Sequence, residues 1–171
     1  MLGLDDDHNG EQTNVTEARK IEAPLAAPEK LEADLVVLPR EIAEDGRGLY
    51  DDSVITIVKE LESLGADARY QHEKDGRAWI GEEGAAKIAL DLIIGIASGA
   101  GWSGLQALFR GSFRTRRVRV RVGRYEQLAD GSTKAEWYEI DGNGAEVSEM
   151  LRELERSEGH DEKARTEEIE E

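Results

Sequence analysis

One long apolar segment dominates the hydrophobic pattern of the chain. Between Ile88 and Phe109 the only charged or amide side chains are Asp91 and Gln106, whereas apolar residues elsewhere occur singly or in short alternating sets. Any core must therefore form against this segment. Because its apolar residues are not confined to one helical face, the pattern predicts a long central helix that is covered on most sides. The glycines that would let other backbone approach this helix are Gly95, Gly99, Gly101 and Gly104.

A membrane span is the first alternative for the same segment. As a helix, residues 88–109 would rise about 33 Å, enough to cross a hydrocarbon core of about 30 Å. Gly95 and Gly99 form a G-x-x-x-G pair, and seven arginines follow between Arg110 and Arg124, as on a cytoplasmic flank. A span would, however, separate two halves that each lack enough apolar surface for a core, and we expect no secretory signal before it. We therefore prefer a soluble helix.

A dinucleotide-binding loop is the second alternative. Residues 99–104 satisfy G-x-G-x-x-G, and the preceding Gly95 extends the match to the G-x-x-x-G-x-G of short-chain dehydrogenases. That chemistry needs a strand before the glycines and a helix N-terminus that holds the pyrophosphate. Residues 82–87 instead resemble the first turns of a helix, and the only acid near the expected distance of about 20 residues is Glu126. We expect no cofactor, and a nucleotide-binding oxidoreductase is the less favoured function.

Shorter patterns place the remaining elements. Apolar residues recur at helical spacing from Val54 to Leu64 and are followed by Gly65, a residue that commonly ends a helix. Asp75-Gly76 predicts a tight hairpin turn between two short strands. The segments predicted in this way are strands at 35–38, 66–72, 77–80, 117–122 and 134–140, and helices at 54–64 and 145–157 flanking the central helix.

The last two strands also suggest a register. A three-residue loop with Gly131 in the left-handed conformation would pair Ala129 with Thr133. This register places Val122 opposite Ile140, Tyr125 opposite Trp137 and Arg121 opposite Asp141. Apolar residues then face apolar residues, and the charges are opposite in sign.

These elements follow the order β-α-β-β-α-β-β-α, which indicates an α+β fold with a mainly antiparallel sheet against a long central apolar helix and two shorter helices. We expect one domain at residues 34–157, between disordered acidic tails at 1–33 and 158–171. Removing residues 1–30 should then cost almost no stability. The net charge of −16 disfavours DNA and anionic lipid as partners, and the absence of cysteine favours a cytoplasmic protein.

The order of motifs resembles a known family. G-E-E-G-A at residues 81–85 opens the glycine-dotted apolar stretch, which ends in Phe109-Arg110 and a basic run at 114–117. A valine-rich strand, a turn, a second strand and an acidic helix follow. Over about residues 53–155 this sequence is similar to the effector-associated constant component family of bacterial conflict systems. The resemblance implies a non-enzymatic accessory module that acts beside effector proteins, with no catalytic residues to carry over.

Residues with catalytic or metal-binding chemistry do not form a recognisable set. The histidines, His8, His72 and His160, are too far apart in sequence to suggest a metal site. Asp91 is unusual inside an apolar segment, and we expect an ion pair with Lys87 or with the arginine-rich strand. The alternative is a buried carboxyl group that acts as an acid or a base. We therefore expect a protein-interaction module and no enzyme.

The arginine-rich strand is the candidate interaction surface. Arg117, Arg119 and Arg121 alternate onto one face, and Tyr125 and Trp137 lie on the same hairpin. Stacking on nucleic-acid bases is one use of such a set. Acidic residues on the neighbouring strand and in the flanking tails would compete with nucleic acid for this face. We expect it to bind acidic side chains of the C-terminal segment or of a protein partner.

Overall fold

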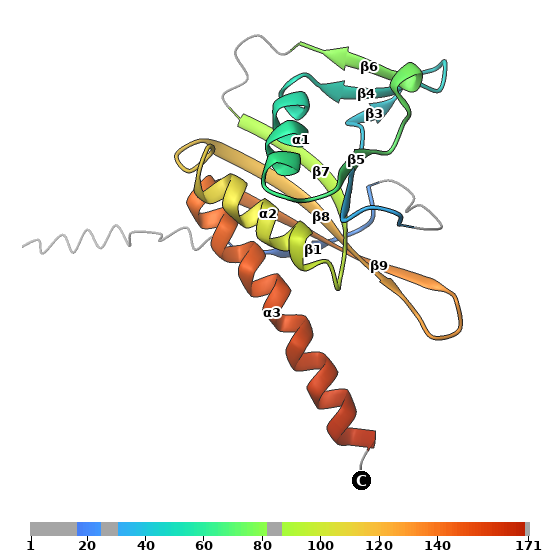
Figure 1. Ribbon diagram of the computed structural model, residues 1–171, viewed down its shortest axis with the longest axis vertical. Coiled ribbons are helices and arrows are strands. Elements are labelled where there is room, and N and C mark those ends of the chain that lie inside the picture. The colour runs from blue at the N-terminus through green and yellow to red at the C-terminus, as the bar shows by residue number, and fades with distance from the viewer. Residues whose placement is uncertain (1–16, 25–30, 82–86, 170–171) are drawn as a thin grey trace, which may run out of the picture.

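The computed structural model of the protein describes the backbone of residues 17–24, 31–81 and 87–169, and the side chains as far as residue 156. Within these residues, a mixed six-stranded sheet carries three helices on one face, and a small second sheet lies beside it (Figure 1). The α+β class expected from the sequence is confirmed, but the expected order of elements is not.

The main sheet contains, in spatial order, β1 (Arg19–Ile21), β9 (Thr133–Asn143), β8 (Arg117–Gln127), β7 (Lys87–Gly95), β2 (Leu35–Val37) and β5 (Ala68–Tyr70). The pairs β7–β8 and β2–β5 are parallel, and the other neighbours are antiparallel. The helices are α1 (Ser53–Ser63), α2 (Gly99–Arg110) and α3 (Gly144–Ile169), and α3 extends beyond the sheet (Figure 1). The small sheet has the order β3 (Glu41–Ile42), β4 (Gly48–Asp51) and β6 (Arg77–Ile80), with a 3-10 turn at Lys74–Gly76 before β6.

The predicted central helix is wrong, because the apolar segment divides into strand β7 and helix α2. Side chains of β7 are buried on both faces of the sheet: Leu90 and Leu92 pack under the helices, while Ile93 packs on the opposite face. A strand that is covered on both faces has a continuous apolar pattern, which resembles that of a buried helix. Ser98 ends the turn and caps α2, its Oγ accepting a hydrogen bond from the Gly101 N–H at 3.1 Å.

This division also removes the proposed membrane span as a single helix. Among the described residues, no helix is both long and apolar enough to cross a membrane. The helical start expected at residues 82–86 lies outside the described residues.

The hairpin predicted around Asp75-Gly76 is also wrong. Its two strands belong to different sheets: β5 pairs in parallel with β2, and β6 pairs in parallel with β4. Asp75 and Gly76 lie in the 3-10 turn instead. The pairing of both strands is therefore determined by partners far away in sequence and not by the local turn signal.

The register predicted for β8 and β9 is shifted by two residues. Val122 lies opposite Tyr138, and Arg121 lies opposite Glu139. The loop has three residues and Gly131 is left-handed, with φ +87°, as predicted, but Leu128 and Ser132 close it with a 2.8 Å hydrogen bond. In such loops the left-handed residue is the third and not the second. A shift of two residues leaves each side chain on the face of the sheet that was predicted for it. The arginines therefore still share a face with Glu139 and Asp141.

Helix α1 forms as predicted. Val54, Ile57, Val58 and Leu61 are buried, and the left-handed Gly65, with φ +93°, follows the end of the helix. These side chains join one core with the helix-facing residues of β7 and β8 and with those of α2 and α3.

The segments expected to be tails contain regular structure. β1 lies within residues 1–33 and pairs with β9, and α3 continues as a helix to Ile169. β1 was missed because three residues of an edge strand, two of them charged, carry no apolar alternation. Residues 1–16, 25–30 and 170–171 lie outside the described part of the chain.

Candidate functional site

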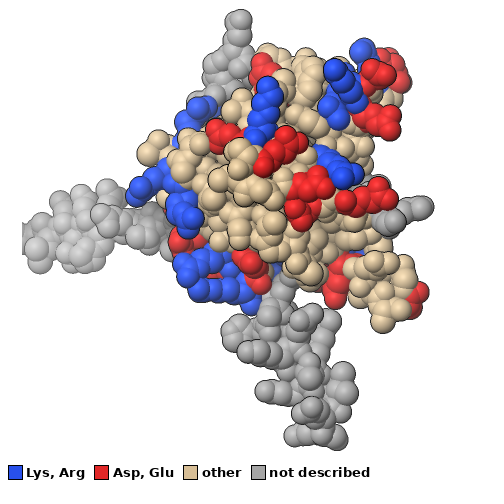
Figure 2. Space-filling model, in the orientation of Figure 1, with Lys and Arg blue, Asp and Glu red and all other residues tan. Residues whose placement is uncertain are grey.

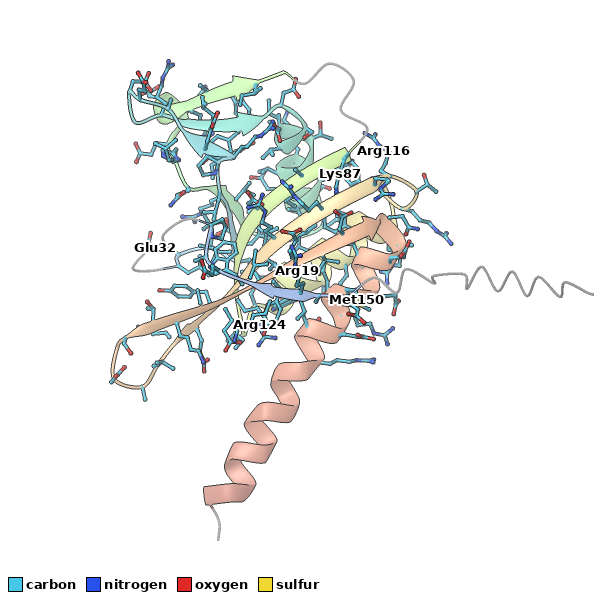
Figure 3. All side chains as sticks on the ribbon, turned by 180° about the vertical axis from the view of Figure 1, so that it is seen from behind. Arg19, Glu32, Lys87, Arg116, Arg124 and Met150 are labelled. Carbon is cyan, nitrogen blue, oxygen red and sulfur yellow. The ribbon has the colours of Figure 1, made fainter. Side chains whose placement is uncertain are left out.

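Figure 3 views the main sheet from behind Figure 1, on the side away from helices α1 and α2. The alternate arginines of β8 belong to this face. The valines of β8 point to the helices. The residues that alternate with them, Arg117, Arg119 and Arg121, therefore point to the other face. In register, these arginines form three rows with their neighbours on β7 and β9: Lys87–Arg117–Asn143, Ala89–Arg119–Asp141 and Asp91–Arg121–Glu139.

Two of the three arginines have carboxylate partners from their own sheet. The Nε of Arg121 lies 3.5 Å from Asp91 Oδ1 and 3.8 Å from Glu139 Oε2. Arg117 lies 3.7 Å from Asp141, which also forms an ion pair with Lys87. The expected pairing of Lys87 with Asp91 within one helix is wrong, while the alternative partner, the arginine strand, is found.

Arg119 has no such partner. Its neighbour on β7 is Ala89, at the position where the next row has Asp91. Its neighbour on β9, Asp141, is bound by Lys87 and Arg117 instead. Among the described residues, no carboxylate lies within ion-pair distance of Arg119, and its buried Nε has no hydrogen-bond partner.

A cleft of about 340 Å³ lies over this position. The floor of the cleft is the main sheet. Its wall is formed by the segment after β2, which leads into the small sheet. Leu38 still donates to the Asp91 carbonyl at 2.9 Å, after which the chain turns away at Pro39. β2 therefore pairs with only the second half of β7, and the space beside Ala89 stays open. The lining residues are Leu38, Arg40, Glu41, Tyr50, Asp51, Val54, Ala89, Asp91, Arg119 and Arg121.

The charges that line the cleft balance in number, three arginines against three acids. Arg40 lies 3.3 Å from Asp51 across the wall, and Arg121 lies near Asp91 on the floor. Burial raises the pKa of Asp91 above its ordinary value, although the positive charges of Arg121 and Arg119 oppose that rise. The buried Oδ1 of Asp91 accepts no hydrogen bond from the described residues.

The aromatic candidates lie on the same face but further along the sheet. Tyr125 and Trp137 form a second, smaller core with Ile93 and Leu38, and both are buried. The rings are thus packed against apolar side chains, and Gly123 leaves room for the indole of Trp137. The structure brings Arg119 and Arg121 together with Asp91, whereas Tyr125 and Trp137 lie outside the cleft.

The glycines of residues 99–104 follow a strand and open a helix, as a dinucleotide loop requires. The end of this helix is filled by the chain itself. Ser98 caps it and donates to Asp34 Oδ1 at 2.8 Å, and a side chain at Gly101 would lie 3.2 Å from the Asp34 carbonyl. An aspartate therefore occupies the place that a pyrophosphate would need.

Histidines and metal ligands do not gather in the part of the chain that the structure describes. His72 contacts the Tyr50 hydroxyl through Nδ1 at 3.1 Å, and no group of three potential ligands occurs among the described residues. His8 and the side chain of His160 lie outside them. No protein-family model, curated protein or solved structure matches the chain.

Sequence reasoning found the floor of the cleft but not its wall. Arg40, Glu41 and Asp51 come from a loop and two short strands whose position depends on the small sheet, and no local pattern indicates it. One signal was present for the floor: the open face of β7 has the alternation Lys87, Ala89, Asp91. Ala89 interrupts this row of charged side chains. That indicates an arginine without a neighbouring acid only once β7 is known to be a strand.

Proposed function

We propose that this chain is a cytoplasmic protein-interaction module without catalytic activity, and that it binds an acidic segment of a partner protein at the Arg119 cleft. The absence of cysteine in 171 residues supports the compartment, because disulfides are typical of exported proteins. Both signs of charge are present on the face that carries the helices (Figure 2), so that face is not a uniformly charged surface.

The observation that carries the proposal is the position of Arg119. A half-buried guanidinium group that has no carboxylate within ion-pair distance among the described residues is costly, because burial removes water and the Asp91 charge acts on Arg119 only from beyond that distance. An arginine also offers several donors in a planar fork that fits a carboxylate with two hydrogen bonds. A partner's acidic side chain would supply the charge that Ala89 does not.

The other titratable groups of the cleft support binding over proton transfer. Asp91 already has the Arg121 guanidinium group 3.5 Å from its Oδ1, so this carboxyl group forms part of an ion pair in the cleft. The Tyr50 hydroxyl already accepts a hydrogen bond from the backbone N–H of His72 at 3.2 Å. Burial raises the pKa of Tyr50, which opposes its use as a base.

The family resemblance suggests the kind of partner. Components of this kind accompany effector proteins in bacterial conflict systems, so we propose that the partner is such an effector. The bound segment would then position the effector and take no part in its chemistry.

The test is capture of a partner by the immobilised full-length chain from native lysate, followed by titration of the identified and purified partner. The variant Ala89→Asp supplies an internal carboxylate to Arg119, and Arg117→Ala removes an exposed arginine outside the cleft. We expect the partner's Kd to rise at least about tenfold for Ala89→Asp, the effect of losing one charge-assisted contact, and to change little for Arg117→Ala. Equal binding by wild type and Ala89→Asp, or no partner at all, would contradict the proposal.

A further inference from the structure

The chemistry of the cleft is more restrictive than a general preference for negative charge. Three acids line it besides the arginines: Glu41, Asp51 and Asp91. Arg40 lies near Asp51 and Arg121 lies near Asp91, which leaves Arg119 and Glu41 among the charged residues of the lining. Arg119 can balance a single carboxylate, whereas the second charge of a doubly charged group would have no counterpart and would be repelled by Glu41. The floor beside Arg119 also holds an acceptor group, the Asp91 carboxyl, whose Oδ1 has no hydrogen-bond donor among the described residues.

We infer that the cleft is a subsite for one carboxylate that carries a hydrogen-bond donor beside it, as a glutamate or aspartate residue does through its own backbone N–H. The carboxylate would bind the Arg119 guanidinium group over Ala89, and the donor would face Asp91 or Glu41. This inference rests on the proposed function and names the group that the partner inserts.

The chain itself contains the same contact one row further along the sheet. Asp91 on β7 lies directly across the parallel pair from Arg121, as Ala89 does from Arg119. Asp91 approaches the Arg121 Nε to 3.5 Å. The ligand carboxylate would therefore complete a repeated arrangement, in which a carboxylate over β7 meets each of these arginines on β8.

The size of the cleft agrees with a side chain and its adjoining backbone. Sites for small ligands usually have volumes of about 300–1,000 Å³ and bury most of the ligand. The cleft, at about 340 Å³, lies at the lower end of that range. It thus suits one residue of a peptide better than a long segment, and the rest of the partner would lie outside it.

The experiment is a titration of the ¹⁵N-labelled full-length chain with N-acetyl-glutamate N-methylamide, followed by NMR at constant ionic strength. The Arg119 Nε–H signal and the backbone amides of Ala89 and Asp91 report on the cleft. We expect saturable shifts with a Kd on the order of 1–10 mM, which is appropriate to a single contact. The neutral isostere N-acetyl-glutamine N-methylamide should give less than about a tenth of this affinity, since it lacks the charge.

Two variants control the titration. Ala89→Asp should abolish the shifts while its spectrum stays that of a folded protein, and Arg117→Ala should keep them. Equal shifts with the glutamine probe, or tighter binding of inorganic phosphate than of the glutamate probe, would overturn the inference. So would the absence of saturable shifts at about 50 mM probe, which is several times the expected Kd.

This outcome is independent of the partner titration. A partner whose binding requires a free Arg119, together with no response to the glutamate probe, would preserve the proposed function and reject the carboxylate subsite. A response to the probe without any protein partner would preserve the subsite as a site for a free small acid and reject the protein-interaction role.

Discussion

Asp91 and Ala89 lie two residues apart on the same face of β7 and give their neighbouring arginines opposite environments. Asp91 meets Arg121, while Ala89 leaves Arg119 facing a cleft. The sequence predicted that acidic side chains would face these arginines, because alternating residues of a strand share a face. It could not predict which arginine lacks a partner, since that depends on the pairing of β7 with β8.

Replacing Asp91 by asparagine should remove one contribution to the pH dependence of stability. Burial raises the pKa of Asp91 in the folded chain, with Arg121 as the main opposing influence. The contribution of Asp91 to stability is therefore full below its unfolded pKa of 3.8 and is lost as the pH rises through the folded pKa. Relative to Asp91→Asn, the wild type should lose unfolding free energy as the pH increases above about 4.

Urea unfolding of both proteins between about pH 3 and pH 7 measures this difference directly. The acids whose pKa values are lowered, such as Asp45 and Glu136, are present in both proteins and cancel in the comparison. A difference that stays constant with pH, or one in which the wild type gains, would contradict the burial of Asp91.

At the scale of elements, the boundary between β7 and α2 shows where the sequence pattern was ambiguous. A strand with both faces buried and a helix buried on all sides have the same continuous apolar pattern, so periodicity alone does not separate them. Ser98 and Gly99 carried the deciding signal, since serine is a common N-cap. Helix α1 was predictable because only one of its faces is buried, which leaves a clear period.

Two glycines at helix starts should respond oppositely to alanine. A Cβ at Gly144, the first residue of α3, would lie 2.0 Å from the Phe113 carbonyl oxygen, whereas a Cβ at Gly99, the first residue of α2, meets nothing within 4 Å. Gly144→Ala should cost about 3 kcal/mol or more, because backbone has to move. Gly99→Ala should be neutral or stabilise by up to about 1 kcal/mol.

Thermal and urea unfolding of the two variants tests the docking of α3 against the end of α2. Equal stability of Gly144→Ala and wild type would mean that the start of α3 is not held against Phe113 as described.

At the scale of the whole molecule, the sheet order was beyond local inference. β5 and β6 are close in sequence but belong to different sheets, and β1 pairs with the distant β9. Such pairings depend on which apolar faces meet in the core. The sequence therefore predicted the class of the fold and most strands. It predicted neither the small sheet nor the cleft that this sheet lines.

The N-terminal edge strand gives a prediction at this scale. Removing residues 1–24 should cost about 1–3 kcal/mol, because β1 pairs with β9 and Ile21 packs on the core formed by Trp137 and Tyr125. Removing only residues 1–16 keeps β1 and is the matched control, for which we expect an unchanged stability. Urea unfolding of both truncations measures the effect. Equal stability of the two would show that β1 adds nothing to the sheet.

The proposed site depends on Arg119, which has no carboxylate within ion-pair distance among the described residues and would gain one from an acid over Ala89. A double-mutant cycle between Ala89→Asp and Arg119→Ala, measured by urea unfolding at low salt, tests it most directly. We expect Ala89→Asp to stabilise the chain when Arg119 is present and to destabilise it when Arg119 is replaced, with a coupling energy of about 1–2 kcal/mol. A coupling energy near zero would show that Arg119 is already neutralised or does not face the cleft, and the carboxylate site would then be wrong.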